Sequence, residues 1–153
     1  MKTKAVIIGF AHMHVNEVAL YISEQPDFEL IGAADVNAGE EKIPPLRYTA
    51  GWNLENVRKN YCANIYDDYK EMLDELKPDY AFMCENCLKP EIVEECAKRH
   101  INVSIEKPIA VSYDEAKKIQ ASVERYGIEA VVNWPVVWRE YIHKMKFALD
   151  SEL

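Results

Sequence analysis

Short, continuously apolar segments alternate along this chain with segments of helical periodicity, and this alternation most narrows the folds available to it. Continuous apolar runs are typical of strands that are covered on both faces, as in parallel sheets. An alternating order of strands and helices indicates right-handed parallel units. We therefore predict an α/β fold with a doubly wound, mostly parallel six-stranded sheet and helices on both faces. The expected strands are 5–8, 28–34, 64–66, 80–84, 103–105 and 130–132.

The segments between these strands carry apolar residues at three- and four-residue spacing, which indicates amphipathic helices. Asp67 or Asp68 is expected to cap one helix, and the pair Ser112 and Glu115 forms a capping-box pattern before another, which Gly127 ends. Glycines and prolines make 37–53 the least regular part. The expected helices are 13–23, 54–60, 68–76, 90–99, 112–126 and 138–149.

Composition limits the classes of partner. The 153 residues suit one domain, and 18 basic against 26 acidic side chains give a net charge of −8. This charge disfavours nucleic-acid backbones and anionic membranes. No apolar run approaches the roughly 20 residues that span a bilayer, and residues 1–8 fit a strand better than a signal peptide. We expect a cytoplasmic protein whose four cysteines are reduced.

The first strand ends in a turn that could bind a dinucleotide. The segment Gly9-Phe10-Ala11-His12-Met13-His14 stands where a G-x-G-x-x-G fingerprint would lie, although only its first glycine is kept. Asp35 follows the second strand, where a carboxylate binds ribose hydroxyls and repels a 2′-phosphate. We therefore predict cofactor binding by Gly9, Phe10, Ala11, His12, Met13 and Asp35, with NAD favoured over NADP.

Other interpretations of these residues stay open. Asp35 is also compatible with a simple turn or cap, and His12 could donate hydrogen bonds to phosphate. His14 alone fits an ordinary surface histidine better. Two histidines one residue apart make a poor metal site without a nearby carboxylate, and we expect no metal site.

Glu106-Lys107-Pro108 follows the fifth strand and precedes a capped helix. Ligands of open α/β sheets bind at the carboxyl ends of the strands, so a charged pair at this position favours chemistry. The alternative is a solvated loop salt bridge worth well under ~1 kcal/mol.

A cysteine pattern competes as a metal site. Cys84, Cys87, Cys96 and His100 are of the residue types that bind zinc. However, Cys84 closes a strand, and Cys96 lies among the inward-facing residues of a helix, where cysteine behaves as a small hydrophobe. We expect no zinc here.

The order of these motifs resembles the amino-terminal, Rossmann-like NAD(P)-binding domain of the glucose–fructose oxidoreductase/inositol 2-dehydrogenase family (Gfo/Idh/MocA). The resemblance covers nearly all of the chain. It is carried by the segment that begins Glu106-Lys107-Pro108, by Asn86-Cys87-Leu88-Lys89-Pro90 after the fourth strand, and by Asn133-Trp134-Pro135 after the sixth.

The resemblance implies roles for individual residues. Lys107 would be the catalytic lysine that orients a substrate hydroxyl, and Glu106 would position it or line the nicotinamide pocket. Asn86 would contact the ribose side of the cofactor, and Trp134 would lie in the loop facing nicotinamide and substrate. Pro108 would fix the turn, and a cis peptide is accessible to it. Two departures are Lys89 where the family usually has His, and Cys84-Glu85 in place of Thr-Pro.

The family's second domain is absent from this chain. We therefore expect 1–149 to be the NAD(P)-binding domain and 150–153 the start of a linker to a substrate and oligomerisation domain. The implied whole is an oxidoreductase that transfers hydride between NAD and a sugar, cyclitol or related polyol, with homo-oligomer contacts in the missing domain. The chain alone would be catalytically incomplete. A nucleotide-sensing Rossmann module is the main alternative, and a zinc protein the weaker one.

Overall fold

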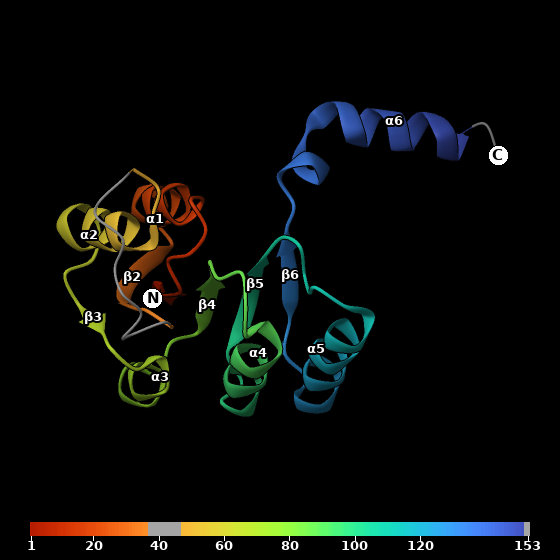
Figure 1. Ribbon diagram of the computed structural model, residues 1–153. Helices are drawn as coiled ribbons and strands as arrows, with labels where there is room; N and C mark the ends of the chain where they lie inside the picture. Colours follow the sequence, from red (N-terminus) through yellow and green to blue (C-terminus); the bar gives the residue numbers. More distant parts are fainter. Residues whose placement is uncertain (37–46, 152–153) are drawn as a thin grey trace.

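The computed structural model describes residues 1–36 and 47–151, which form a parallel six-stranded sheet flanked by helices (Figure 1). The strand order is β3-β2-β1-β4-β5-β6, so the first strand lies in the middle of the sheet. Successive strands are added on one side of β1 as far as β3 and on its other side from β4 onward. The predicted doubly wound sheet is confirmed. Its strands are β1 (Thr3–Ile8), β2 (Phe28–Ala34), β3 (Ile65–Tyr66), β4 (Tyr80–Met83), β5 (Asn102–Glu106) and β6 (Ala130–Asn133).

Helices cover both faces of this sheet. Figure 1 shows α1 and α2 on one face and α3, α4 and α5 on the other, while the last helix extends away from the sheet. The helices are α1 (Val15–Glu24), α2 (Ala50–Asn60), α3 (Tyr69–Leu76), α4 (Lys89–Lys98), α5 (Tyr113–Tyr126) and α6 (Glu140–Ser151), with a 3-10 turn η1 (Pro135–Trp138) before α6.

Three helix starts differ from the prediction by two residues or more, and one of them is that of α1, at Val15 instead of Met13. Helix α2 begins at Ala50 instead of Leu54, because the Thr49 hydroxyl accepts a hydrogen bond from the backbone N–H of Trp52 at 3.4 Å. Gly51, expected to break a helix, lies inside its first turn. The last α-helix begins at Glu140, after η1, and extends through Ser151. Part of the predicted irregular segment, residues 37–46, lies outside the described residues.

The predicted caps are present. Asp68 accepts a hydrogen bond from the backbone of Lys70 at 2.7 Å, and the Ser112 hydroxyl accepts one from Glu115 at 3.2 Å. The carboxylate of Glu115 accepts from the backbone N–H of Val111, so the reciprocal half of the capping box is displaced by one residue. Gly127 ends α5 with a left-handed φ of 66°.

The sheet separates two hydrophobic cores. Because consecutive strand residues point to opposite faces, Ile7 packs against α1 and α2, whereas Ile8 packs on the side of α4 and α5. This arrangement explains why the strands are continuously apolar. The core on the side of α3, α4 and α5 includes Val6, Ile8, Met72, Met83, Ile92, Cys96, Val103, Ile105 and Ile119; the other includes Ala5, Ile7, Phe10, Val15, Ala19, Leu54, Val57 and Cys84.

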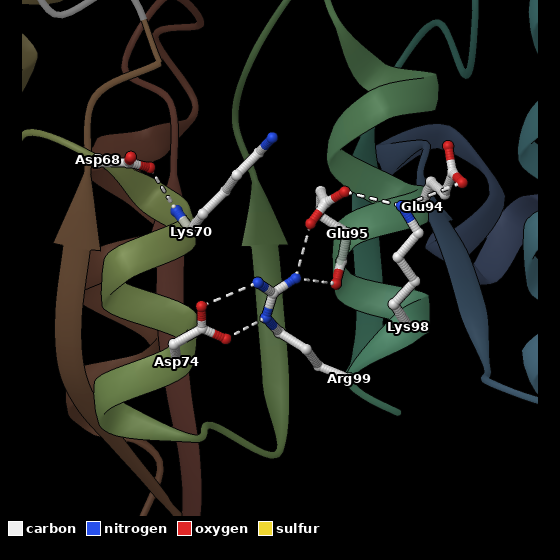
Figure 2. A network of polar contacts seen from close by, with 7 residues as sticks. All are labelled: Asp68, Lys70, Asp74, Glu94, Glu95, Lys98 and Arg99. Atoms are coloured by element: carbon white, nitrogen blue, oxygen red, sulfur yellow. Dashed lines mark hydrogen bonds and ion pairs between the residues drawn. The ribbon is translucent and has the colours of Figure 1, made fainter.

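Arg99 joins α3 to α4 at the end of the sheet that lies away from the carboxyl ends of the strands (Figure 2). Its guanidinium donates to both carboxylate oxygens of Asp74, at 2.6 and 3.1 Å, and to Glu95 at 2.8 Å. The fork geometry of arginine allows this two-sided bond, which lysine could not make. The hydrogen bonds from Arg99 hold the pKa of both carboxyl groups below its usual range.

Gly32 in β2 allows α3 to pack closely on the sheet. A Cβ at this position would lie 2.5 Å from Cδ1 of Leu76 and 3.3 Å from Sδ of Met72. Gly32 therefore makes room for the Leu76 side chain beneath α3.

We expect Gly32→Ala to lower the free energy of unfolding by about 1–3 kcal/mol, because the added methyl group overpacks this contact. Chemical denaturation measures the loss. In a double-mutant cycle, Gly32→Ala should cost less when Leu76 is already Ala. Equal costs in the two backgrounds would contradict the proposed clash.

Helix α6 lies apart from both cores and has no buried residue. Tyr141, Met145 and Leu149 recur at four-residue spacing and are each more than half exposed. None of the helices in the described part of the chain is both long and apolar enough to cross a membrane.

Candidate functional site

The candidate site lies at the carboxyl ends of the strands, at the reversal of strand order between β1 and β4, where ligands of open α/β sheets bind. The loop after β1 starts at Gly9, whose N–H donates to the carbonyl of Ala34 at 2.9 Å. Gly9 has a φ of 87°, and a Cβ there would lie 2.7 Å from Cβ of Glu85. Glycine is therefore required both for the backbone conformation and for the close approach of the two loops.

Glu85 is a buried carboxyl group directly beneath this turn. It is 1 % exposed, and Oε1 accepts a hydrogen bond from the backbone N–H of Asn86 at 2.7 Å. Its other oxygen, Oε2, is buried without a hydrogen-bond partner among the described residues. Burial raises the pKa of this carboxyl group. The sequence showed Glu85 as a departure from the family pattern, but only the fold shows that it packs against Gly9.

Asn53 in α2 fixes the turn from the other side. Its amide donates to the carbonyl of Phe10 at 2.9 Å and accepts from Asn16 in α1 at 2.8 Å. Phe10 buries its whole side chain in the core, so it offers the turn only its backbone. Sequence analysis did not identify Asn53. The available signal was a polar residue one helical turn before Val57, on the inward face of α2.

His12 connects the turn to the strands beyond it. Its backbone N–H donates to the carbonyl of Cys84 at 3.1 Å, and its Nε2 lies 3.1 Å from Nζ of Lys107. Burial lowers the pKa of His12, the neighbouring cations lower it further, and Glu106 opposes them. The neutral imidazole is therefore favoured beside the Lys107 amine.

Glu106 lies at the centre of the site and is 1 % exposed. Oε1 accepts from the backbone N–H of Lys107 at 3.1 Å, and Oε2 accepts from the Asn133 amide at 2.9 Å. His14 Nδ1 lies 3.1 Å from Oε1 without making a hydrogen bond to any described group. The expectation that His14 is an ordinary surface histidine is therefore wrong, because the start of α1 places it against β5.

Lys89 supports the same strand end from below. Its side chain is buried, and Nζ donates to the carbonyl of Glu106 at 2.6 Å and to the carbonyl of Pro108. Burial lowers the pKa of this amine. The peptide between Lys107 and Pro108 is cis. Lys89 thus holds the turn that carries Lys107 and does not point into solvent.

The other predicted cofactor residues lie at the same edge of the sheet, in the segments that follow β1, β2, β4 and β6. Asp35 directly follows β2 and is half-buried, Asn86 is exposed after β4, and Trp134 is 49 % exposed after β6. Ala11 is half-buried and Met13 is 45 % exposed in the first turn. Three strand spacings separate the end of β2 from that of β5, or roughly 14 Å, which suits the two ends of an extended dinucleotide.

The cysteine pattern does not form a joint site. Cys84 and Cys96 are both buried, but they belong to cores on opposite faces of the sheet. Among the described residues, the histidine, cysteine and acidic groups that converge closely enough to hold an ion are His12, His14 and Glu106.

The burial of Glu85 predicts how the stability of the fold depends on pH. Because its pKa is raised in the folded state, its contribution to stability is complete below its unfolded pKa and is lost as pH rises through the folded value. We expect Glu85→Gln to abolish this part of the loss and to be more stable than the native chain at neutral pH. Urea denaturation from pH 4 to 8 measures both. Parallel pH profiles for the two proteins would contradict the prediction.

Comparison with known proteins gives a consistent result. Residues 3–133 match the family model described as an oxidoreductase family with an NAD-binding Rossmann fold. Glucose-6-phosphate 3-dehydrogenase of Bacillus subtilis (strain 168) is 23 % identical over 146 residues, which cover 95 % of this chain and 37 % of that protein.

Solved structures share the fold at low identity. The myo-inositol 2-dehydrogenase of Lactobacillus plantarum superposes with a TM-score of 0.79 at 17 % identity, over 99 % of this chain and 42 % of its own. The WlbA dehydrogenase of Bordetella pertussis, in complex with NADH and UDP-GlcNAcA, gives the same four values. The chain therefore spans less than half the length of these proteins.

Proposed function

Because this chain belongs to the Gfo/Idh/MocA oxidoreductase family, whose NAD-binding Rossmann fold it carries, we propose that it is the cofactor half of a dehydrogenase of sugars, cyclitols or related polyols. The observation that supports this most is the position of Lys107. Its amine lies at the carboxyl end of β5, 3.1 Å from Nε2 of His12, and its backbone N–H donates to buried Glu106. A titratable amine at this edge of the sheet is placed to exchange a proton with a bound hydroxyl group.

The first turn fits a dinucleotide. Gly9 makes a tight turn packed against Glu85, and Asn53 holds the carbonyl of Phe10, so the backbone of 9–13 is preformed for a pyrophosphate. Asp35 would accept hydrogen bonds from the adenine-side ribose. Asn86 would contact the other ribose, and Trp134 would cover the nicotinamide end. NAD supplies the hydride acceptor when it is bound.

Lys107 would perform the proton chemistry. As a substrate hydroxyl is oxidised, its proton needs an acceptor and the developing negative oxygen needs a nearby positive charge. The Lys107 amine can take the proton and then stabilise the oxygen. Glu106 would position this lysine through the backbone bond it accepts, and Lys89 would hold the same turn through two carbonyls.

The remainder of the protein would complete the substrate site. The relatives named above are more than twice as long as the matched part, and their names include a sugar phosphate and a cyclitol. We propose a polyol or sugar substrate bound between Lys107 and a second domain, with 150–153 leading toward that domain. Homo-oligomer contacts would also lie there.

Calorimetric titration of this chain with NAD and NADP tests cofactor choice. We expect NAD to bind more tightly, because the carboxylate of Asp35 repels a 2′-phosphate. Asp35→Ser should reduce the ratio of the two affinities about tenfold, while Asp27→Ser, at the opposite end of β2, should leave it unchanged. An unchanged ratio in Asp35→Ser would assign the discrimination to other residues.

Lys107→Met tests the chemical role in the full-length enzyme. We expect kcat to fall by about 10²–10⁴-fold, the range for removing a general acid–base group, while NAD affinity changes little. Lys117→Met, on the exposed face of α5, is the matched control and should retain activity. Near-native turnover of Lys107→Met would mean that this lysine only makes a loop contact.

A further inference from the structure

Two histidines and a carboxylate converge on one point of the candidate site. His12 and His14 come from the turn and the start of α1, Glu106 comes from the end of β5, and one ligand atom from each lies within 4.8 Å of the others. No metal site was expected from the sequence, because two histidines one residue apart make a poor metal site without a nearby carboxylate. The fold supplies that carboxylate from Glu106, which lies 92 positions after His14 in the sequence.

The carboxylate is prepared as a metal ligand. Glu106 is 1 % exposed, and its Oε2 is fixed by the Asn133 amide at 2.9 Å. Metal-binding carboxylates are typically held in this way by a second group that orients them. The other oxygen, Oε1, faces His14 Nδ1 at 3.1 Å.

One nitrogen of each histidine lies close to the Glu106 carboxylate. His14 Nδ1 is buried and makes no hydrogen bond among the described residues, and the nearest charged group is Oε1 of Glu106 at 3.1 Å. His12 Nε2 faces the Lys107 amine at 3.1 Å, while its Nδ1 accepts a 3.2 Å bond from the backbone of His14. An ion at Nε2 would move the ring proton to Nδ1 and so break the latter bond.

We propose that His12, His14 and Glu106 form a binding site for a divalent transition-metal ion of the Zn²⁺ type. Imidazole nitrogens with one carboxylate suit such ions, and three protein ligands leave an open coordination position. The Lys107 amine already lies 3.1 Å from His12 Nε2, so an ion bound to that nitrogen and the amine are alternative occupants of the same space. Metal binding therefore withdraws Lys107 from its position and makes the site inactive.

This competition predicts that two kinds of substitution change the metal affinity in opposite directions. Removing a ligand should weaken metal binding, whereas removing the competing amine should strengthen it. The titration is made on the cofactor-free chain. An absence of metal binding would therefore not argue against NAD binding, and an absence of NAD binding would not argue against the metal site.

The experiment is calorimetric titration of the chain with Zn²⁺, repeated with Co²⁺ while its absorption spectrum is recorded. We expect one ion per chain, and a Co²⁺ spectrum without thiolate charge-transfer bands. Glu106→Gln and His12→Ala should each weaken binding by about tenfold or more, and Asn133→Ala by roughly tenfold through lost orientation. Lys107→Met should bind several-fold more tightly.

His143→Ala on α6 and Cys87→Ser after β4 are the controls, and neither should change the affinity. Circular dichroism of each variant shows whether it folds, and His12→Ala, whose side chain is part-exposed, keeps the test valid if Glu106→Gln does not fold. The proposal is overturned by the absence of binding, by native affinity in His12→Ala, by a loss caused by a control variant, or by unchanged affinity in Lys107→Met.

Discussion

The buried carboxylate of Glu106 is the group on which the arrangement of the site depends. The carboxylate joins the end of β5 to β6 by accepting a hydrogen bond from Asn133. The backbone carbonyl of Glu106 accepts a hydrogen bond from the buried Lys89 amine. A buried polar group is costly unless hydrogen bonds satisfy it, so these neighbours are constrained to stay where they are. The position of Lys107, one residue further, follows from that constraint more than from any contact that Lys107 makes itself.

The reversal of strand order imposes the second constraint. The loops after β1 and β4 lead away from each other there. They are in contact at Gly9, where Glu85 occupies the space that a side chain would need. The structure retains only the first glycine of the usual fingerprint because this one contact needs it. The positions of the other two are Ala11 and His14, and His14 uses its ring to reach β5. The altered turn thus exchanges close helix packing for a polar contact across the sheet.

Much of the fold could be predicted because its determinants are local. Continuous apolar runs, the Asp68 and Ser112 caps and Gly127 each act within a few residues, and all appear where expected. The site was predicted less completely because it depends on long-range pairs. His14 was expected to be a surface residue, but the fold brings Glu106 to it. Asn53 fell in the segment expected to be irregular, although it holds the Phe10 carbonyl. No local pattern distinguishes such partners.

Helix α6 has a consequence for how the chain moves. Its backbone hydrogen bonds are protected by no packed layer, since it buries none of its residues. A helix of 12 residues is marginal in water on its own. Amide hydrogens in α6 should therefore exchange with solvent whenever this helix opens locally. Those of the central strands should exchange only when the whole sheet unfolds. We therefore expect the cooperative unit of the described chain to end at β6, with α6 outside it.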